Sequence, residues 1–203
     1  IINHVYRYAD GKGLRVSITF VDEGGHFTQD VRIQCRARLA RKVFAIKGRG
    51  GPDVPYTAPP KKQQITVRGR YIGEAWQYLL GVDAGKQQIM DNLKIKSPGP
   101  RFCHFPSNEE CGYGHAFFVG LLSEKLVYKE NHKNPWQWEK IPGHERNEPL
   151  DCRNYALAAC RVLAPDFDAI IRKRNGQEQP KKPQPAERKR KDPFDRLERY
   201  FDM

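Results

Sequence analysis

The sequence has no apolar run of membrane-spanning length, and its start, Ile-Ile-Asn-His, is unlike a secretion signal. It also has few cysteines: the five present are an odd number and lack the spacing of a disulfide framework. An initiator methionine is absent as well, so we expect a piece of a longer protein. Together these absences predict a protein that has no membrane partner and folds in a reducing compartment.

Acidic residues are too few to balance the basic ones. The 203 residues include 36 Lys and Arg against 24 Asp and Glu, which gives a formal net charge of +12. The pI is near 9.6. Such an excess favours a polyanionic partner, nucleic acid before a membrane surface. The length suits one domain, residues 1–165, followed by a tail.

The tail divides into two parts. Residues 172–191 contain nine Lys or Arg and three prolines without an apolar period, so we expect residues 166–191 to be a basic linker without regular structure. Residues 192–203 form a short amphipathic segment whose apolar stripe is Phe194, Leu197, Tyr200 and Phe201. Such a stripe suits docking on a partner or folding back on the domain.

The domain itself mixes the two apolar periods. Period two predicts strands at residues 14–22, 43–46, 76–82, 102–105, 125–129 and 136–141. Period 3.6 predicts helices at residues 28–39, after Asp83, at 114–124 and at 149–163. Residues 52–70 have a loop-like composition. We therefore expect a mixed α/β fold.

Asp22 ends the first predicted strand. Leu14, Val16, Ile18 and Phe20 alternate with polar residues. Asp22 has the same parity as this apolar set, so its carboxylate is expected on the buried face of the sheet, at the C-terminal end of the strand. Solubility does not explain an acid in that place.

Asp151 lies in the first turn of the helix predicted at 149–163. That helix is apolar almost all round, which is typical of a core helix. Pro149 suits a first helical position, and Asn147 or Glu148 can cap the helix. A carboxylate on a core-facing helix must be solvated, paired or bound to a metal. The alternative is an acid that complements the helix dipole.

Asp22 and Asp151 are together the candidate catalytic and metal-binding residues. Phosphodiester hydrolysis by two divalent ions requires carboxylates that converge on cations about 3.5–4 Å apart. A strand-end Asp that faces a helix-borne Asp supplies such convergence, and we expect Mg²⁺ or Mn²⁺ as the cofactor. The alternative is two unrelated acids, one in a cap and one in a turn. His26 and His144 lie near these acids in sequence and either assist them or are ordinary surface histidines.

A basic, glycine-rich stretch, Lys47-Gly-Arg-Gly-Gly-Pro52, follows the second predicted strand. Such an exit brings cations and backbone N–H groups close to phosphates, although a flexible solvated loop is the alternative. We expect Lys47, Arg49 and Lys86 to track the phosphodiester backbone of DNA.

Two other motifs do not carry chemistry. The stretch Gly81–Gln87 differs from a phosphate-binding P-loop in its glycine spacing and in having Gln87 where a hydroxyl is needed, so Asp83 is expected to cap a helix. A zinc cluster is conceivable at Cys103, His104, Cys111 and His115, but the two-residue cysteine spacing of structural zinc sites is absent.

Five stretches, in order and over about residues 14–163, resemble the C-terminal nuclease region of the large terminase subunit of lambda-type tailed phages. They are Val21-Asp-Glu-Gly-Gly25, Ala45-Ile-Lys-Gly48, Gly81-Val-Asp-Ala-Gly-Lys86, Cys103-His-Phe-Pro106 and Arg146-Asn-Glu-Pro-Leu-Asp-Cys152 continuing through Tyr155-Ala-Leu-Ala-Ala159. The resemblance implies a ribonuclease H-like fold and a metal-dependent endonuclease that cuts concatemeric phage DNA during packaging.

The resemblance also assigns positions and partners. Asp22 matches the acid after the family's central strand, Asp151 the acid on its final helix, and Asn147 with Glu148 the polar pair before that helix. The family's other metal-binding Asp lies on an earlier strand and has no counterpart here, since Asp10 is in a Gly-flanked turn. We therefore expect a nuclease domain truncated at its N-terminus and weakly active or inactive alone.

The expected partners are double-stranded phage DNA, the terminase small subunit and the capsid portal, in the host cytoplasm during phage assembly. The alternative function, which needs no chemistry, is a basic module that binds DNA or a partner.

Overall fold

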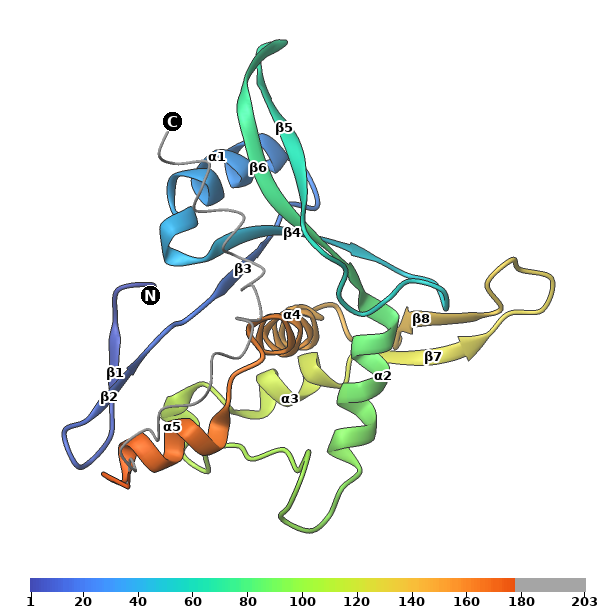
Figure 1. Cartoon of the computed structure of the whole chain (residues 1–203). Coiled ribbons are helices and arrows are strands. Elements are labelled where there is room, and N and C mark those ends of the chain that lie inside the picture. The colour runs from blue at the N-terminus through green and yellow to red at the C-terminus, as the bar shows by residue number, and fades with distance from the viewer. Residues whose placement is uncertain (178–203) are drawn as a thin grey trace, which may run out of the picture. The chain divides into compact units, whose positions relative to one another are not determined.

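The computed structural model describes residues 1–177 and divides the chain into two units, Ile1–Pro165 and the segment that begins at Asp166 (Figure 1). The strands are β1 (Val5–Arg7), β2 (Gly13–Arg15), β3 (Thr19–Asp22), β4 (Val43–Arg49), β5 (Lys61–Val67), β6 (Arg70–Gly81), β7 (Glu124–Tyr128) and β8 (Trp136–Lys140). The helices of the first unit are α1 (Thr28–Ala37), α2 (Val82–Leu93), α3 (His115–Leu121) and α4 (Glu148–Leu163), with short 3-10 helices η1 (Leu39–Arg41) and η2 (Glu109–Cys111).

The main sheet has the strand order β3-β4-β6-β5. β3, β4 and β6 run parallel, and β5 pairs antiparallel with β6 at one edge. The first four residues of β4 are all buried, as expected for an inner parallel strand covered on both faces. The first unit is thus a mixed α/β structure with a mixed sheet and flanking helices, as the sequence predicted.

The two faces of the sheet have different partners (Figure 1). On one face, Cys35 of α1 packs against Val43 and Ala45 of β4. On the other face, Phe20, Phe44 and Tyr78 form an aromatic cluster with ring centroids 5.1–6.5 Å apart. α4 contacts the sheet at β3. Asp22 has the parity of Phe20 and therefore lies on the face turned towards α4.

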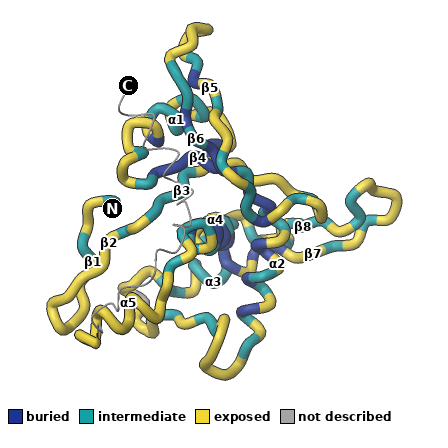
Figure 2. Tube along the Cα trace, viewed as in Figure 1, coloured by how far each residue is buried: buried dark blue, intermediate teal, exposed yellow. Residues whose placement is uncertain are grey.

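A second core cluster holds the helices together. Ile89 of α2, Leu121 of α3 and Leu150 of α4 are each at most 2% exposed and pack against one another. The β7–β8 hairpin projects from this part of the fold, and its tip is largely exposed (Figure 2). α2, β7 and α4 also carry the charged residues Lys86, Glu124 and Asp151.

Three expected elements differ in the structure. The strand expected at residues 14–22 is divided between β2, which pairs with β1 in a separate hairpin, and β3 in the main sheet. The loop expected at residues 52–70 contains β5 and the first residue of β6. β5 begins Lys-Lys-Gln-Gln, and Ile65 is its only fully buried residue. Because β5 is an edge strand, it lacks the apolar alternation that would have identified it as a strand in the sequence.

The strand expected at residues 102–105 is not formed within the described chain. Phe105 instead packs into the cluster of α2, α3 and α4. Its neighbouring aromatic rings, Phe117 and Phe118, have centroids 6.2 and 5.2 Å away. The apolar residues that predicted a strand at 102–105 thus include Phe105, which packs in the helical core and not in a sheet.

The second unit contains helix α5 (Phe167–Arg174). Oδ1 of Asp166 accepts a hydrogen bond from the backbone N–H of Ala169 at 2.8 Å and caps the helix. The last turn carries three basic residues, which suits the negative end of the helix dipole. α5 lies inside residues 166–191, where we expected a linker without regular structure, and that expectation is wrong for the helix. The rest of the linker and the segment 192–203 lie outside the described residues.

None of the helices in residues 1–177 combines the length and the apolar character that crossing a bilayer requires.

Candidate active site

Asp22 is the last residue of β3 and sits beside Ile46 of β4. Its side chain is exposed rather than buried, so the sequence predicted its face correctly and its burial wrongly. Two hydrogen bonds fix the carboxylate: Oδ1 accepts from the backbone N–H of Gly24 at 2.9 Å, and Oδ2 accepts from the hydroxyl of Tyr155 at 3.1 Å. The adjacent Glu23 is buried and bound by Arg32 and Gln77, so it belongs to a separate ion-paired group.

Asp151 lies in the first turn of α4, and its side chain is 30% exposed. Oδ2 accepts a hydrogen bond from Nδ2 of Asn147 at 3.0 Å. Oδ1 lies 3.8 Å from Nζ of Lys86. Asn147 is the N-cap residue, but its side chain makes no capping bond and holds the Asp151 carboxylate instead. This departs from the capping role that we expected for it.

Tyr155 bonds to Asp22 and senses the charge of Asp151. It follows Asp151 by one turn on the same side of α4, and its hydroxyl donates to Asp22. Burial raises the pKa of Tyr155, and the charges of Asp22 and Asp151 raise it further, so the hydroxyl keeps its proton. A Cβ at Gly48 would come within 2.8 Å of Val82 and 3.8 Å of the Tyr155 hydroxyl, so glycine there lets β4 pass close to this group.

The surroundings of Asp151 disfavour its charged form. Burial raises its pKa, and the nearby charges of Glu124 and Asp22 raise it as well. Lys86 and Lys140 act in the opposite direction without cancelling these effects. Carboxylates that repel one another in a half-buried place are stabilised by a bound cation. Asp22 and Asp151 offer carboxylate oxygens, the donor type that Mg²⁺ and Mn²⁺ take.

Behind Asp151 is a buried ion pair that the sequence did not reveal. Oε2 of Glu124, the first residue of β7, accepts from Nζ of Lys86 at 2.6 Å. Oε1 of Glu124 accepts from Nδ2 of Asn147 at 2.7 Å, so the Asn147 amide bridges Glu124 and Asp151. The Lys86 and Glu124 side chains are 10% and 6% exposed. Lys86 therefore does not reach a DNA surface, and our expectation that it tracks phosphates is wrong.

The other predicted DNA contacts, Lys47 and Arg49, are exposed but belong to the end of β4 rather than to a loop. By the alternation of the strand they share the side of Ala45, opposite to the side of Ile46 and Gly48. They thus lie on the other side of the sheet end from Asp22.

The residues considered as supporting groups are dispersed. His26 is exposed in the loop after β3. Nδ1 of His144 lies 3.1 Å from the carbonyl oxygen of Val119, which ties its loop to α3. Glu148 is exposed beside Arg146, with 3.8 Å between Oε2 and Nε.

Asp83 does not cap α2. It lies in the first turn, after the N-cap residue Gly81. Its Oδ2 accepts from the backbone N–H of Gly51 at 2.7 Å.

No group of three or more His, Cys, Asp or Glu side chains in residues 1–177 is placed to hold a metal ion. This result covers Cys103, His104, Cys111 and His115, the residues of the conceivable zinc cluster.

Comparisons with a protein family and with individual known proteins both match this chain to terminase large subunits. The family model described as "Terminase large subunit gpA, endonuclease domain" matches residues 1–174. The chain is 29% identical over 168 residues to the terminase large subunit of Escherichia phage lambda and 30% identical over 168 residues to that of Enterobacteria phage P21. Each alignment covers 79% of this chain and 24% of the relative, so the chain spans about a quarter of the relatives' length. No solved structure matches it.

Proposed function

This chain belongs to the family of terminase large subunit gpA endonuclease domains, and from that membership we propose that it is a metal-dependent DNA endonuclease domain. Its substrate would be concatemeric double-stranded phage DNA, cut during genome packaging. The observation that carries the proposal is that the Tyr155 hydroxyl donates to Asp22 and also lies within electrostatic reach of Asp151. Family membership confirms the resemblance found in the sequence motifs. Metal-dependent cutting of DNA by this chain is what we propose.

We propose a ribonuclease H-like arrangement for this domain. The support is the parallel run β3, β4 and β6, with an acid at the C-terminal end of β3 that faces α4. Ligand sites of α/β sheets lie at the carboxyl ends of the strands, where side chains from the following loops and helices meet. Asp22 occupies such a position.

Asp22 and Asp151 would hold Mg²⁺ or Mn²⁺. When bound, such ions activate water and stabilise the leaving oxygen of a phosphodiester. Tyr155 and Gly24 would hold the Asp22 carboxylate in one orientation. Asn147 would do the same for Asp151, while the Glu124–Lys86 pair fixes Asn147 from behind.

Lys140 is the basic residue best supported as a phosphate contact near this site. Its charge lowers the pKa of Asp151, which places the ammonium within electrostatic reach of the carboxylate. It is exposed, and its Nζ donates to the backbone carbonyl of Glu145 at 2.9 Å. Lys47 and Arg49 would contact phosphates farther along the DNA, from the other side of the sheet end.

The test is cutting of supercoiled plasmid in Mn²⁺ by the whole chain and two variants, Asp22→Asn and Asp151→Asn. We expect each substitution to reduce nicking at least about 100-fold, because removing an interaction made in the transition state lowers the rate directly. Asp91→Asn is the control, since Asp91 is an exposed acid of α2 paired with Lys94. Nicking that persists in both site variants would refute the proposal.

The alternative function is a basic module that binds DNA or a partner without cutting. The net charge of +12 favours it independently of any acid. Salt-sensitive DNA binding, together with Mn²⁺ binding that neither Asp22→Asn nor Asp151→Asn weakens, would support this alternative.

We further propose that the protein carrying this domain works with a terminase small subunit and a capsid portal in the host cytoplasm during phage assembly. The support is family membership alone, and the chain spans about a quarter of its relatives.

A further inference from the structure

The β7–β8 hairpin exposes aromatic surface that the core does not use. Tyr128 and Trp136 face each other across the two strands, with ring centroids 5.2 Å apart, and are 57% and 56% exposed. Leu126 on the same hairpin is 39% exposed. Tryptophan and tyrosine supply large flat faces for stacking, so an exposed group of them on a projecting hairpin indicates a binding surface.

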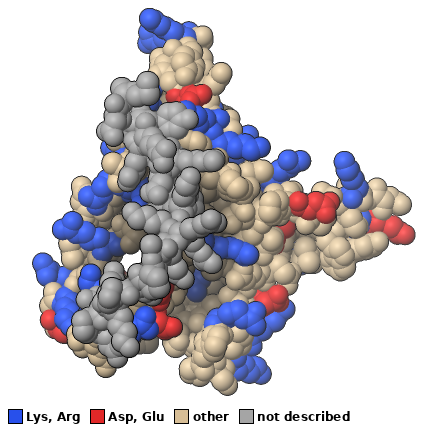
Figure 3. Space-filling view, viewed as in Figure 1, with Lys and Arg blue, Asp and Glu red and all other residues tan. Residues whose placement is uncertain are grey.

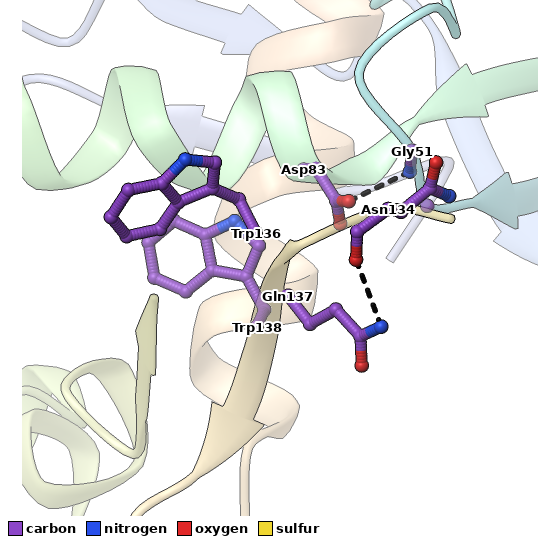
Figure 4. Close-up of a pocket in the computed structure, with 7 residues that line it drawn as sticks. Gly51, Asp83, Asn134, Trp136, Gln137 and Trp138 are labelled. Carbon is purple, nitrogen blue, oxygen red and sulfur yellow. Dashed lines mark hydrogen bonds between the residues drawn. The ribbon is translucent and has the colours of Figure 1, made fainter. Parts of the chain in front are cut away.

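A pocket of about 250 Å³ lies beside this surface, between the hairpin, the start of α2 and the loop after β4 (Figure 4). Trp136 and Trp138 form its aromatic side. Pockets for drug-sized ligands measure about 300–1,000 Å³, so this one suits a single planar ring system.

Polar groups complete the lining. The Asp83 carboxylate is held by the backbone N–H of Gly51, and Nε2 of Gln137 donates to the backbone carbonyl of Asn134 at 3.0 Å. Gly51 has a φ of +119°, and a Cβ there would come 3.3 Å from Nδ2 of Asn134, so glycine lets the backbone reach the pocket. The pocket thus places polar groups beside an aromatic wall formed by Trp136 and Trp138.

The position of the pocket relates it to the proposed cutting site. Gly50, which also lines the pocket, lies four residues beyond Ile46, the register partner of Asp22. At about 3.3 Å per strand residue, this places the pocket about 13 Å along the strand direction from the level of Asp22. A DNA strand whose phosphates pass Asp22 would therefore have other nucleotides within reach of the pocket.

We propose that this pocket takes one unpaired nucleobase of the DNA strand next to the cutting site. The inference rests on the proposed nuclease function and adds a subsite to it. Bases stack on aromatic faces in proteins that bind single strands, and their edges hydrogen-bond to amide and carboxylate groups. A base inside a duplex cannot enter this pocket, because it is covered by its neighbours in the stack. The pocket therefore selects DNA with a flipped or single-stranded nucleotide.

A cationic side chain is the competing ligand, because aromatic slots with an acid also bind ammonium groups. The Asp83 carboxylate already accepts the Gly51 N–H, which satisfies part of its charge. The net charge of the chain, +12, also repels a basic peptide and attracts a nucleic acid. These two observations favour the base.

The experiment uses the intrinsic fluorescence of the whole chain in EDTA, so that no cutting occurs. The chain has three tryptophans, and Trp76 lies outside the pocket, so a Trp76→Phe background leaves only Trp136 and Trp138 as reporters. Base stacking quenches indole emission. We expect saturable quenching by a short single-stranded oligonucleotide, and binding at least about tenfold weaker for an abasic version or a blunt duplex of that sequence.

Variants locate the effect. In the wild-type background, measured by anisotropy of a labelled oligonucleotide, Trp136→Ala should weaken single-strand binding at least about tenfold, and Trp136→Phe should retain most of it. Tyr71→Ala is the matched control, because Tyr71 on β6 is also 56% exposed. Equal quenching by the abasic oligonucleotide, or quenching by a lysine peptide but not by DNA, would overturn the proposal.

The two proposals fail separately. Asp22 lies outside the pocket lining, so the quenching and the cutting depend on separate groups. Cutting that depends on Asp22 without any quenching would refute the base pocket alone. Quenching together with nicking that persists in Asp22→Asn would support the pocket and refute the nuclease.

Discussion

At the scale of single residues, Asp151 carries a charge that the fold opposes. Burial, Glu124 and Asp22 raise the pKa of Asp151. A raised pKa in the folded state means that the ionised carboxylate destabilises the fold relative to the unfolded chain, where the pKa is ordinary. We therefore expect Asp151→Asn to melt at a higher temperature than the wild type at pH 8 without divalent ions, and the difference to close as the pH falls through the folded-state pKa.

Asp91 provides a control, because its pKa is shifted in the direction opposite to that of Asp151. Hydrogen bonds from Gln87 and Lys94 lower the pKa of Asp91, so its ionised form is favoured in the fold and that contribution is lost as the pH falls. Asp91→Asn should not raise the melting temperature at pH 8. A wild type that is more stable than Asp151→Asn at pH 8 would show that Lys86 and Lys140 outweigh the burial of Asp151.

The buried Glu124–Lys86 ion pair should matter for the stability of the fold, and removing one partner should lower the free energy of unfolding. Replacing one member leaves the other charge buried, which typically destabilises a protein by about 3–5 kcal/mol. We expect Lys86→Met and Glu124→Gln each to lower unfolding stability strongly in urea titrations, and the double variant to lose less than their sum. The exposed pair Lys62–Glu74, with side chains 36% and 38% exposed, should show a coupling of only about 0–1 kcal/mol. Equal coupling in both pairs would contradict this account.

The sequence indicated part of the proposed site. Asp22 and Asp151 stood out because each is a carboxylate in an apolar pattern, which local sequence reveals. Glu124 and Tyr155 were missed as site residues, because the hydrogen bonds that define them join positions 23 or more residues apart. Lys86 was misread, because a basic residue beside a glycine looks the same in sequence whether its ammonium is solvated or paired inside the fold.

At the scale of elements, the β5–β6 hairpin depends on a glycine. Gly73 has a φ of +140°, and a Cβ there would come 1.9 Å from Nη1 of Arg36, which donates to the carbonyl of Ile72 at 2.8 Å. Gly69, in the same hairpin, has a φ of +75° and nothing within 4 Å of an added Cβ. We expect Gly69→Ala to cost about 1 kcal/mol through backbone strain and Gly73→Ala to cost clearly more, measured by chemical denaturation.

The control for this prediction is the Arg36→Ala background. Without the guanidinium, the difference between Gly73→Ala and Gly69→Ala should shrink, because only the backbone strain remains. An unchanged difference would show that Arg36 moves aside freely and that the contact is unimportant.

Elements were predictable where burial imposed a pattern. β4 and α4 were found in the sequence because their apolar residues follow the periods of a strand and a helix. α4 nevertheless buries one stripe, including Leu150, Asn154 and Ala158, and leaves Cys152 exposed, so its apolar composition overstated its burial. β5 was not predicted from the sequence, because an edge strand with Lys and Gln at its start has no such pattern.

At the scale of the whole molecule, the excess of basic residues should govern DNA affinity. Lys and Arg side chains are spread over the face in Figure 3 rather than gathered in one patch. We expect the logarithm of the DNA association constant to fall linearly with the logarithm of the salt concentration, and Lys140→Gln to reduce the slope by about one. Lys94→Gln, on an exposed Lys paired with Asp91, should leave the slope unchanged. Equal effects of the two variants would mean that the charge acts diffusely.

The central claim is that Asp22 and Asp151 form one divalent-cation site. The most direct measurement is Mn²⁺ binding to the whole chain without DNA, followed by the loss of the free-ion electron paramagnetic resonance signal. We predict that the wild type and Asp91→Asn bind Mn²⁺ alike, while Asp22→Asn and Asp151→Asn each bind at least about tenfold more weakly, because each variant removes a carboxylate ligand. Mn²⁺ binding of wild-type strength in either site variant would contradict the claim.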